Sequence, residues 1–351
     1  MDAISESLDI DILRLRSELE LHAVLDRALQ DRFSSDVRAL TEFDRRARRM
    51  TYASVVVGCY GLIEQTMDQL LIAVAECLNE IYATSGDLPE TVRVEHRRLI
   101  LECLRNGDRV RTRVAVDELI AIAALAARDD EPPNLVPGVF TYATANYRYP
   151  YSNDLLARLS MRMDREPDAH EAADALNKAG FATYESFLED LVQRRNELAH
   201  SYAEDAIVNP DLLEAYVSIV AAYLRAVVRH VDRELLARVA VEREMKIGSV
   251  VKVWTGRVGI EMSARSISVG DRLLLVKSGR RTLHRVASLQ SEGEDAETFS
   301  VDGPTPINVS AQVELVEQAA EGSEAFVVPE AWLRYWIDDE VAVATQPSDE
   351  G

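Results

Sequence analysis

The chain changes character once, near Met245, and this change constrains its fold more than any other feature. From Ile4 to about Ala240 glycine is scarce, and Leu, Ala, Glu and Arg, which favour helices, predominate. After Met245, short segments rich in Val, Ile and Leu alternate with glycine turns, as strands do. The length of 351 residues also suits two domains better than one. We predict a mainly α helical bundle at residues 1–243, a small all-β barrel at 244–328, and a short helix with a disordered acidic tail at 329–351.

The spacing of apolar residues predicts the helices of the first domain. A long second helix is expected to begin after the Ser34–Asp36 cap and to reach towards Ile81. Its middle, Ala53–Ala75, is apolar nearly all round, which indicates burial inside a bundle. Residues 132–152 contain Pro and Tyr without periodicity and predict a long loop. Further helices are expected at Pro89–Arg105, Val114–Arg128, Asn153–Met163, Ala169–Lys178, Tyr184–His200 and Pro210–Arg238.

The sequence of the second domain predicts five or six short strands with little helix between them, which is typical of a small barrel. The expected strands are Gly248–Gly256, Arg257–Met262, Asp271–Lys277, Thr282–Leu289 and Ala311–Val316. Trp254 lies in the first of them. It would either stack on a ligand or lie in the core, and we expect the core.

Composition excludes several classes of protein. A net charge of −21 argues against a protein that binds nucleic acid over a broad surface, but it does not exclude a local basic pocket. The three cysteines are isolated from one another in segments predicted to be helical: Cys59, Cys77 and Cys103. This spacing predicts buried free thiols in a reducing compartment. We find no metal-ligand spacing, no GxSxG and no GK[ST] phosphate loop, so no cofactor or metal is expected. The N-terminus lacks the order of a signal peptide and no run of 18 apolar residues occurs, which predicts a cytoplasmic protein without a membrane span.

One short motif can carry chemistry. Arg195 and Asn196 are followed by His200 and Tyr202, at the end of one predicted helix and before the next. Histidine is the side chain whose ordinary pKa suits proton transfer near neutral pH. Arginine is always charged, and its guanidinium forms paired hydrogen bonds with two phosphate oxygens. Together they suit proton transfer beside a bound phosphate group. The alternative is that His200 only caps its helix and Arg195 only makes an ion pair.

This pattern resembles the RX4-6H motif of the HEPN superfamily, over about residues 1–240. The stretch Val55–Met67 also resembles the second helix of a bacterial HEPN nuclease branch found in defence islands. The resemblance implies that Arg195 binds the scissile phosphate and that His200 acts as acid or base. It also implies a homodimer in which two motifs face one cleft. Tyr202 stands where HEPN toxins paired with antitoxins carry a modified tyrosine, or it packs beside the motif.

Three further side chains are candidates for supporting the motif. Asn196 lies four residues before His200, shares its helix face and is able to orient the ring. Glu64 lies in an apolar stretch, where a buried carboxylate needs a partner such as Arg195 or Arg194. The alternative for Glu64 is an exposed helix face. Arg195 and His200 lie about 140° apart on an ideal helix, so the site needs a helix end, a bend or a second subunit.

The sequence therefore predicts a metal-independent endoribonuclease that acts in phage defence or as a toxin and cleaves RNA by attack of a 2′-hydroxyl. The alternative is a non-catalytic HEPN dimerisation scaffold with the barrel as its recognition module. Expected partners are RNA, a second copy of the chain, and an antitoxin or another defence-system protein. The barrel resembles domain II of translation elongation factors and related barrels appended to peptidases, on the segments Val258–Met262, Ile267–Leu275 and Leu283–Leu289.

Overall fold

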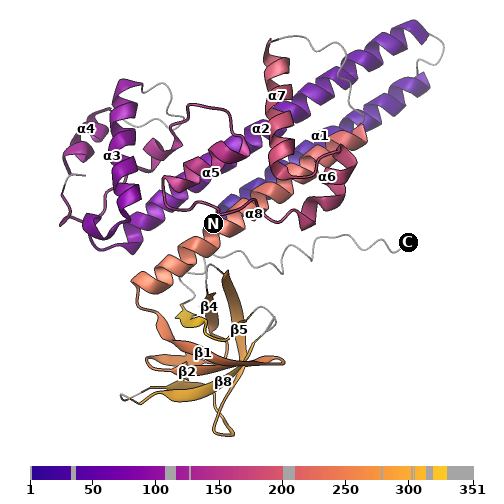
Figure 1. Ribbon diagram of the computed structural model, residues 1–351. Coiled ribbons are helices and arrows are strands. Elements are labelled where there is room, and N and C mark those ends of the chain that lie inside the picture. Colours follow the sequence, from indigo (N-terminus) through magenta and orange to yellow (C-terminus); the bar gives the residue numbers. More distant parts are fainter. Residues whose placement is uncertain are drawn as a thin grey trace. The chain divides into compact units, whose positions relative to one another are not determined.

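In the described residues, the regular elements are helices as far as Glu242 and strands after it (Figure 1). The computed structural model describes residues 2–32, 37–106, 116–125, 128–200, 210–277, 280–301, 303, 305–313 and 319–329. It divides into two compact units, residues 3–231 and the residues from Asp232 onward. The predicted fold class, a helical bundle followed by an antiparallel β-barrel, is confirmed.

Long helices dominate the first unit, as the sequence predicts. The described helices are α1 (Asp2–Arg32), α2 (Val37–Ile81), α3 (Glu90–Arg105), α4 (Val116–Leu125), α5 (Tyr149–Ala157), α6 (Ala173–Ala179), α7 (Tyr184–His200) and α8 (Pro210–Glu242), with short 3-10 turns η1 (Ser85–Asp87), η3 (Pro137–Thr141) and η4 (His170–Ala172). The Ser34–Asp36 cap expected before α2 lies outside the described residues.

Helix α2 is the centre of this unit. It runs antiparallel to α1, and the Leu15 side chain lies where a Cβ on Gly58 would be, so glycine allows close approach of the two helices. Helix α8 also contacts α1, where Nε of Arg16 lies 3.0 Å from a carboxylate oxygen of Glu214. Helix α7, α5 and η3 pack on α2 as well. The apolar middle of α2 is thus buried within one chain, as in Val56 and Leu70, neither of which is exposed.

The segment predicted as a long loop at residues 132–152 is partly helical, and that prediction was wrong for the 3-10 turn at 137–141 and for residues 149–152. Helix α5 begins at Tyr149, not Asn153, because Pro150 in its first turn fits a helix start. It ends at Ala157. The turn η3 buries Val139 and Phe140 completely, so this segment is packed against the bundle.

The second unit contains a closed antiparallel barrel. Its strands are β1 (Lys246–Trp254), β2 (Arg257–Met262), β4 (Arg272–Lys277), β5 (Arg280–Ser291), β8 (Ile307–Val313) and β9 (Glu324–Val328), in the order β4-β9-β1-β2-β8-β5, and β5 pairs with β4 to close the ring. Strand β6 (Glu294–Asp295) extends β5, and β3 (Ser266–Ser268) pairs with β7 (Thr298–Ser300). Alternate residues such as Val258, Ile260 and Val309 fill the interior.

Strand β9 was not expected, although it is required to close the barrel between β4 and β1. It is five residues long, and its partners lie far away in the sequence. The short helix and tail expected at 329–351 lie outside the described residues, except Pro329. The boundary at residue 243 stays a prediction, since contacts group the last turns of α8 with the barrel.

Candidate functional site

Helix α7 carries the motif and has the predicted bounds. One face, including Phe187 and Leu191, is fully buried. His200 is the last residue of the helix. Its side chain, and the whole of Tyr202, lie outside the described residues. The motif arginine and the proposed acid–base residue therefore sit in the final turns of one helix, the arrangement that the sequence suggests.

Arg195 is half-buried and held on two sides. Its Cζ lies 4.9 Å from the centroid of the Tyr60 ring on α2, within the range of a cation–π contact. Its Nη1 donates a 3.1 Å hydrogen bond to Oδ1 of Asn196. The amide of Asn196 thus contacts Arg195, a contact that the sequence did not suggest. These contacts fix the guanidinium at the α2–α7 junction before any ligand binds.

Tyr60 connects Arg195 to the rest of the site. Its hydroxyl accepts the Tyr147 backbone N–H at 3.2 Å, and its single proton has two acceptors within reach, Oδ1 of Asn146 at 3.4 Å and the Glu64 carboxylate. Burial raises the pKa of Tyr60 to about 12; the Tyr147 N–H opposes the shift, the Glu64 charge adds to it and Arg195 opposes it. Tyr60 is therefore neutral at physiological pH. Glu64 is half-buried and reaches this network, as expected of a carboxylate with a partner.

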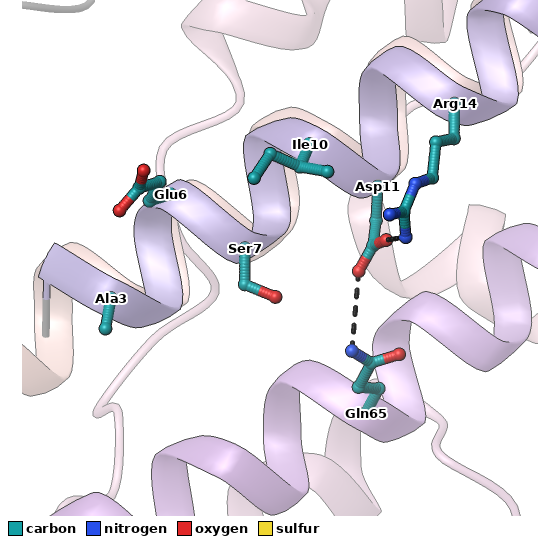
Figure 2. Close-up of a pocket in the computed structure, with 7 residues that line it drawn as sticks. All are labelled: Ala3, Glu6, Ser7, Ile10, Asp11, Arg14 and Gln65. Atoms are coloured by element: carbon teal, nitrogen blue, oxygen red, sulfur yellow. Dashed lines mark hydrogen bonds and ion pairs between the residues drawn. The ribbon is translucent and has the colours of Figure 1, made fainter.

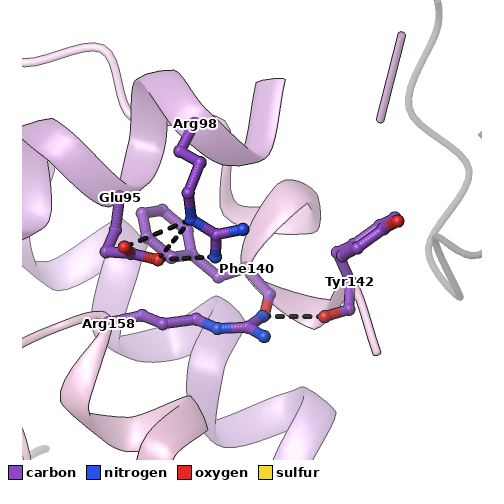
Figure 3. A network of polar contacts seen from close by, with 5 residues as sticks. All are labelled: Glu95, Arg98, Phe140, Tyr142 and Arg158. Carbon is purple, nitrogen blue, oxygen red and sulfur yellow. Dashed lines mark hydrogen bonds and ion pairs between the residues drawn. The ribbon is translucent and has the colours of Figure 1, made fainter. Parts of the chain in front are cut away.

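A second network holds the segment that brings Tyr147 to Tyr60 (Figure 3). Nη1 of Arg158 donates to the carbonyl oxygens of Phe140 at 3.1 Å and Tyr142 at 2.7 Å. Nearby, Arg98 forms a two-pronged contact with Glu95. The chain after η3 is therefore tied to α5.

Arg194 differs from its neighbour. Its Nε contacts Oδ2 of Asp190 at 2.6 Å and its Nη1 donates to the Tyr52 hydroxyl at 3.3 Å. The Tyr216 hydroxyl on α8 donates to the same Asp190 oxygen at 2.8 Å. Arg194 thus links α7 to α2 and α8. These contacts indicate a structural role, whereas the sequence suggested support for Glu64.

Sequence reasoning did not select Tyr60, Asn146 or Tyr147 as site residues. A signal for Tyr60 existed, because Tyr60 and Glu64 lie four residues apart on one helix face. No comparable signal existed for Tyr147, which lies in the segment expected to be a loop and meets Tyr60 across 87 positions.

A shallow groove between α1 and α2 contains none of these residues (Figure 2). It is lined by Ala3, Glu6, Ser7, Ile10, Asp11, Arg14 and Gln65. The Asp11 carboxylate accepts hydrogen bonds from Arg14 at 2.9 Å and from Gln65 at 3.4 Å, so these three side chains of the groove bind one another.

Within the described part of the chain, no three His, Cys, Asp or Glu side chains gather in a way that could hold a metal ion. Among the described helices, none is both long enough and apolar enough to cross a membrane. The three cysteines are free and buried.

Comparison with known proteins gives a match over the helical part of the chain. The HEPN_MAE_28990-like HEPN family model matches residues 30–238, which span α2 to most of α8 and include the whole motif. No curated protein matches the chain. Among solved structures, the C-terminal domain of a protein described as a U32 peptidase from Geobacillus thermoleovorans matches with 11% identity, over 24% of this chain and 94% of that domain, at a TM-score of 0.22.

Proposed function

The chain belongs to the HEPN_MAE_28990-like HEPN family, and from this premise we propose that it is a metal-independent endoribonuclease. HEPN domains are usually ribonucleases or nucleotide-binding modules. The observation that supports catalysis most is the held guanidinium of Arg195. It is half-buried on the Tyr60 ring, one turn before the terminal His200 of the same helix.

In the proposed reaction, Arg195 binds the non-bridging oxygens of the scissile phosphate and stabilises the charge that develops there. His200 takes the proton of the adjacent 2′-hydroxyl, and the freed oxygen attacks phosphorus. The bond from phosphorus to the 5′-oxygen breaks, and that oxygen gains a proton as the protonated His200 gives its proton up, directly or through water. The products are a 2′,3′-cyclic phosphate and a 5′-hydroxyl, and no other reactant is required.

We also propose a homodimer formed through the helical part. The apolar length of Ala53–Ala75 is not in itself a reason for a dimer, because most of its large apolar side chains are buried by the same chain. Support comes instead from apolar side chains of α1 and α2 that are more than half exposed, namely Leu13, Met50 and Val57. A second copy of the chain would remove such side chains from water. A role in phage defence or as a toxin, with an antitoxin or defence-system partner, rests on the sequence resemblance.

Cleavage of labelled RNA by the purified full chain in excess EDTA tests the proposal. We expect Arg195→Ala and His200→Ala to lower the rate by about a hundredfold or more, as loss of a transition-state contact does. Arg194→Ala is the matched control, since it removes the neighbouring arginine and its structural contacts only. Equal rates in the Arg195 and His200 variants and the wild type, at equal folded fraction, would favour the non-catalytic scaffold.

A further inference from the structure

The exposed face of the β1–β2 hairpin carries an aromatic side chain whose placement departs from the sequence prediction. Trp254 is 44% exposed, not buried in the core. The pairing of β1 with β2 shifts between Val250 and Lys252, which places an extra residue, Val251, in β1. One added residue turns every following side chain to the opposite face of a strand. Trp254 therefore points out of the barrel, while Val253 packs against its core.

The neighbouring strand β2 has a glycine, Gly259, at the position beneath this indole. A Cβ on Gly259 would lie 2.8 Å from Cζ3 and 2.9 Å from Cη2 of Trp254, so a larger residue would push the ring away. The outer edge of the six-membered ring therefore lies over the backbone of β2 at Gly259, and the ring keeps exposed surface.

Cations and hydrogen-bonding groups border this ring. The Nζ of Lys252 lies over the indole ring, 5.4 Å from its centroid, in a cation–π contact, and Arg257 is paired directly opposite Trp254. Nη1 of Arg257 donates to Oε1 of Gln290 at 3.3 Å, and the exposed Gln312 is paired with Arg257 on β8. Guanidinium and amide groups thus continue from the aromatic ring across four strands.

Negative charge lies at the margins of this surface. Glu261 is two residues beyond Gly259 on β2, and Asp295 is paired with Gln290 on the outermost strand. The carboxylate of Glu321 accepts the Val253 N–H at 3.4 Å, beside the hairpin. Residues 246–329 contain 9 Lys and Arg against 11 Asp and Glu, so the barrel is nearly neutral in a chain of charge −21.

We propose that the surface formed by Lys252, Trp254, Arg257 and Gln312 binds single-stranded RNA, with an unpaired base stacked on Trp254. An exposed aromatic face accepts any base, cations attract the adjoining phosphates, and amides reach base edges. This combination suits RNA better than an apolar peptide, which would leave the cations unpaired. The inference rests on the proposed function, because it names the form of the substrate and the element that holds it.

Fluorescence anisotropy of the full chain carrying His200→Ala, which leaves RNA intact, tests the surface. The probes are a labelled 12-nucleotide single-stranded RNA of mixed sequence and its duplex. Trp254→Leu keeps an apolar side chain and loses the stacking face, so we expect about tenfold weaker binding of the single strand and unchanged binding of the duplex. Trp254→Phe should stay within about threefold of the parent, because it keeps a π face. Val251→Ala is the matched control, an exposed apolar residue of the same strand, and should have no effect.

Equal affinity of the Trp254→Leu and parent chains for the single strand would overturn the inference, as would equal losses for the single strand and the duplex. Absence of binding by the parent chain would also overturn it. Circular dichroism confirms that the variants are folded. Cleavage by Trp254→Leu with His200 restored separates this inference from the proposed function. A raised KM at unchanged kcat supports both, whereas cleavage with an unchanged KM refutes only the binding surface.

Discussion

Replacement of Tyr60 tests whether its ring positions the arginine of the site. In Tyr60→Leu the face beneath Arg195 is lost, while in Tyr60→Phe the ring stays and only the hydroxyl is removed. A cation–π contact at 4.9 Å on a half-buried guanidinium is worth about 0.5–2 kcal/mol. Because 1.36 kcal/mol is a factor of ten in rate, Tyr60→Leu should lower the single-turnover cleavage rate by about 2- to 30-fold.

The phenylalanine variant should lose stability but keep its cleavage rate. It leaves the Tyr147 N–H without its acceptor, which costs about 1–3 kcal/mol of unfolding free energy. Its cleavage rate should stay within about threefold of the wild type. Tyr52→Phe is the matched control, since Tyr52 lies two turns away on α2 and contacts Arg194 instead.

Single-turnover cleavage at saturating RNA gives the rate, and urea unfolding of the same variants gives the stability. If Tyr60→Leu cleaves at the wild-type rate while folded, Arg195 does not depend on the ring. If Tyr60→Phe is as slow as Tyr60→Leu, the hydroxyl rather than the ring face is what the site requires.

Three further predictions concern other side chains of the helical part of the chain. Arg194→Ala should lower the unfolding free energy by about 1–3 kcal/mol in urea, because it leaves the Tyr52 hydroxyl and Asp190 short of a partner, and should keep the cleavage rate. His96 is buried and its pKa is lowered to about 4 by desolvation, with a smaller contribution from Arg97. Its neutral form therefore contributes stability above about pH 6.5 that is lost towards pH 4, by at most about 3 kcal/mol, and His96→Gln should flatten this part of the urea-measured profile. Light scattering at micromolar concentration should give a dimer for the wild type and a smaller mass for Leu13→Glu; a monomeric wild type would contradict the dimer.

The parts of the fold that depend on local pattern were predictable. The bounds of α7 follow from its apolar spacing, and the motif is contiguous, so both its helix and its place near the helix end emerge from the sequence. The division between helices and strands follows from composition in the same way. Local signals suffice where a residue's neighbours in space are also its neighbours in the chain.

Contacts that join distant segments were not predictable. The partner of Tyr60 is Tyr147, in a segment whose lack of periodicity concealed its packing against α2. Strand β9 is recognisable only by its pairing with β1 and β4. A single bulge at Val251 reversed the expected facing of Trp254, and no rule of alternation locates such a bulge from one sequence.

The central claim is that this chain cleaves RNA through a 2′-hydroxyl without a metal, and one substrate tests it directly. A labelled RNA carrying a single 2′-deoxy nucleotide at the principal cleavage position is incubated with the wild-type chain in EDTA. The account predicts that cleavage stops at that position and continues elsewhere, with 2′,3′-cyclic phosphate and 5′-hydroxyl ends. Cleavage at the deoxy position, or products with 5′-phosphate ends, would contradict it.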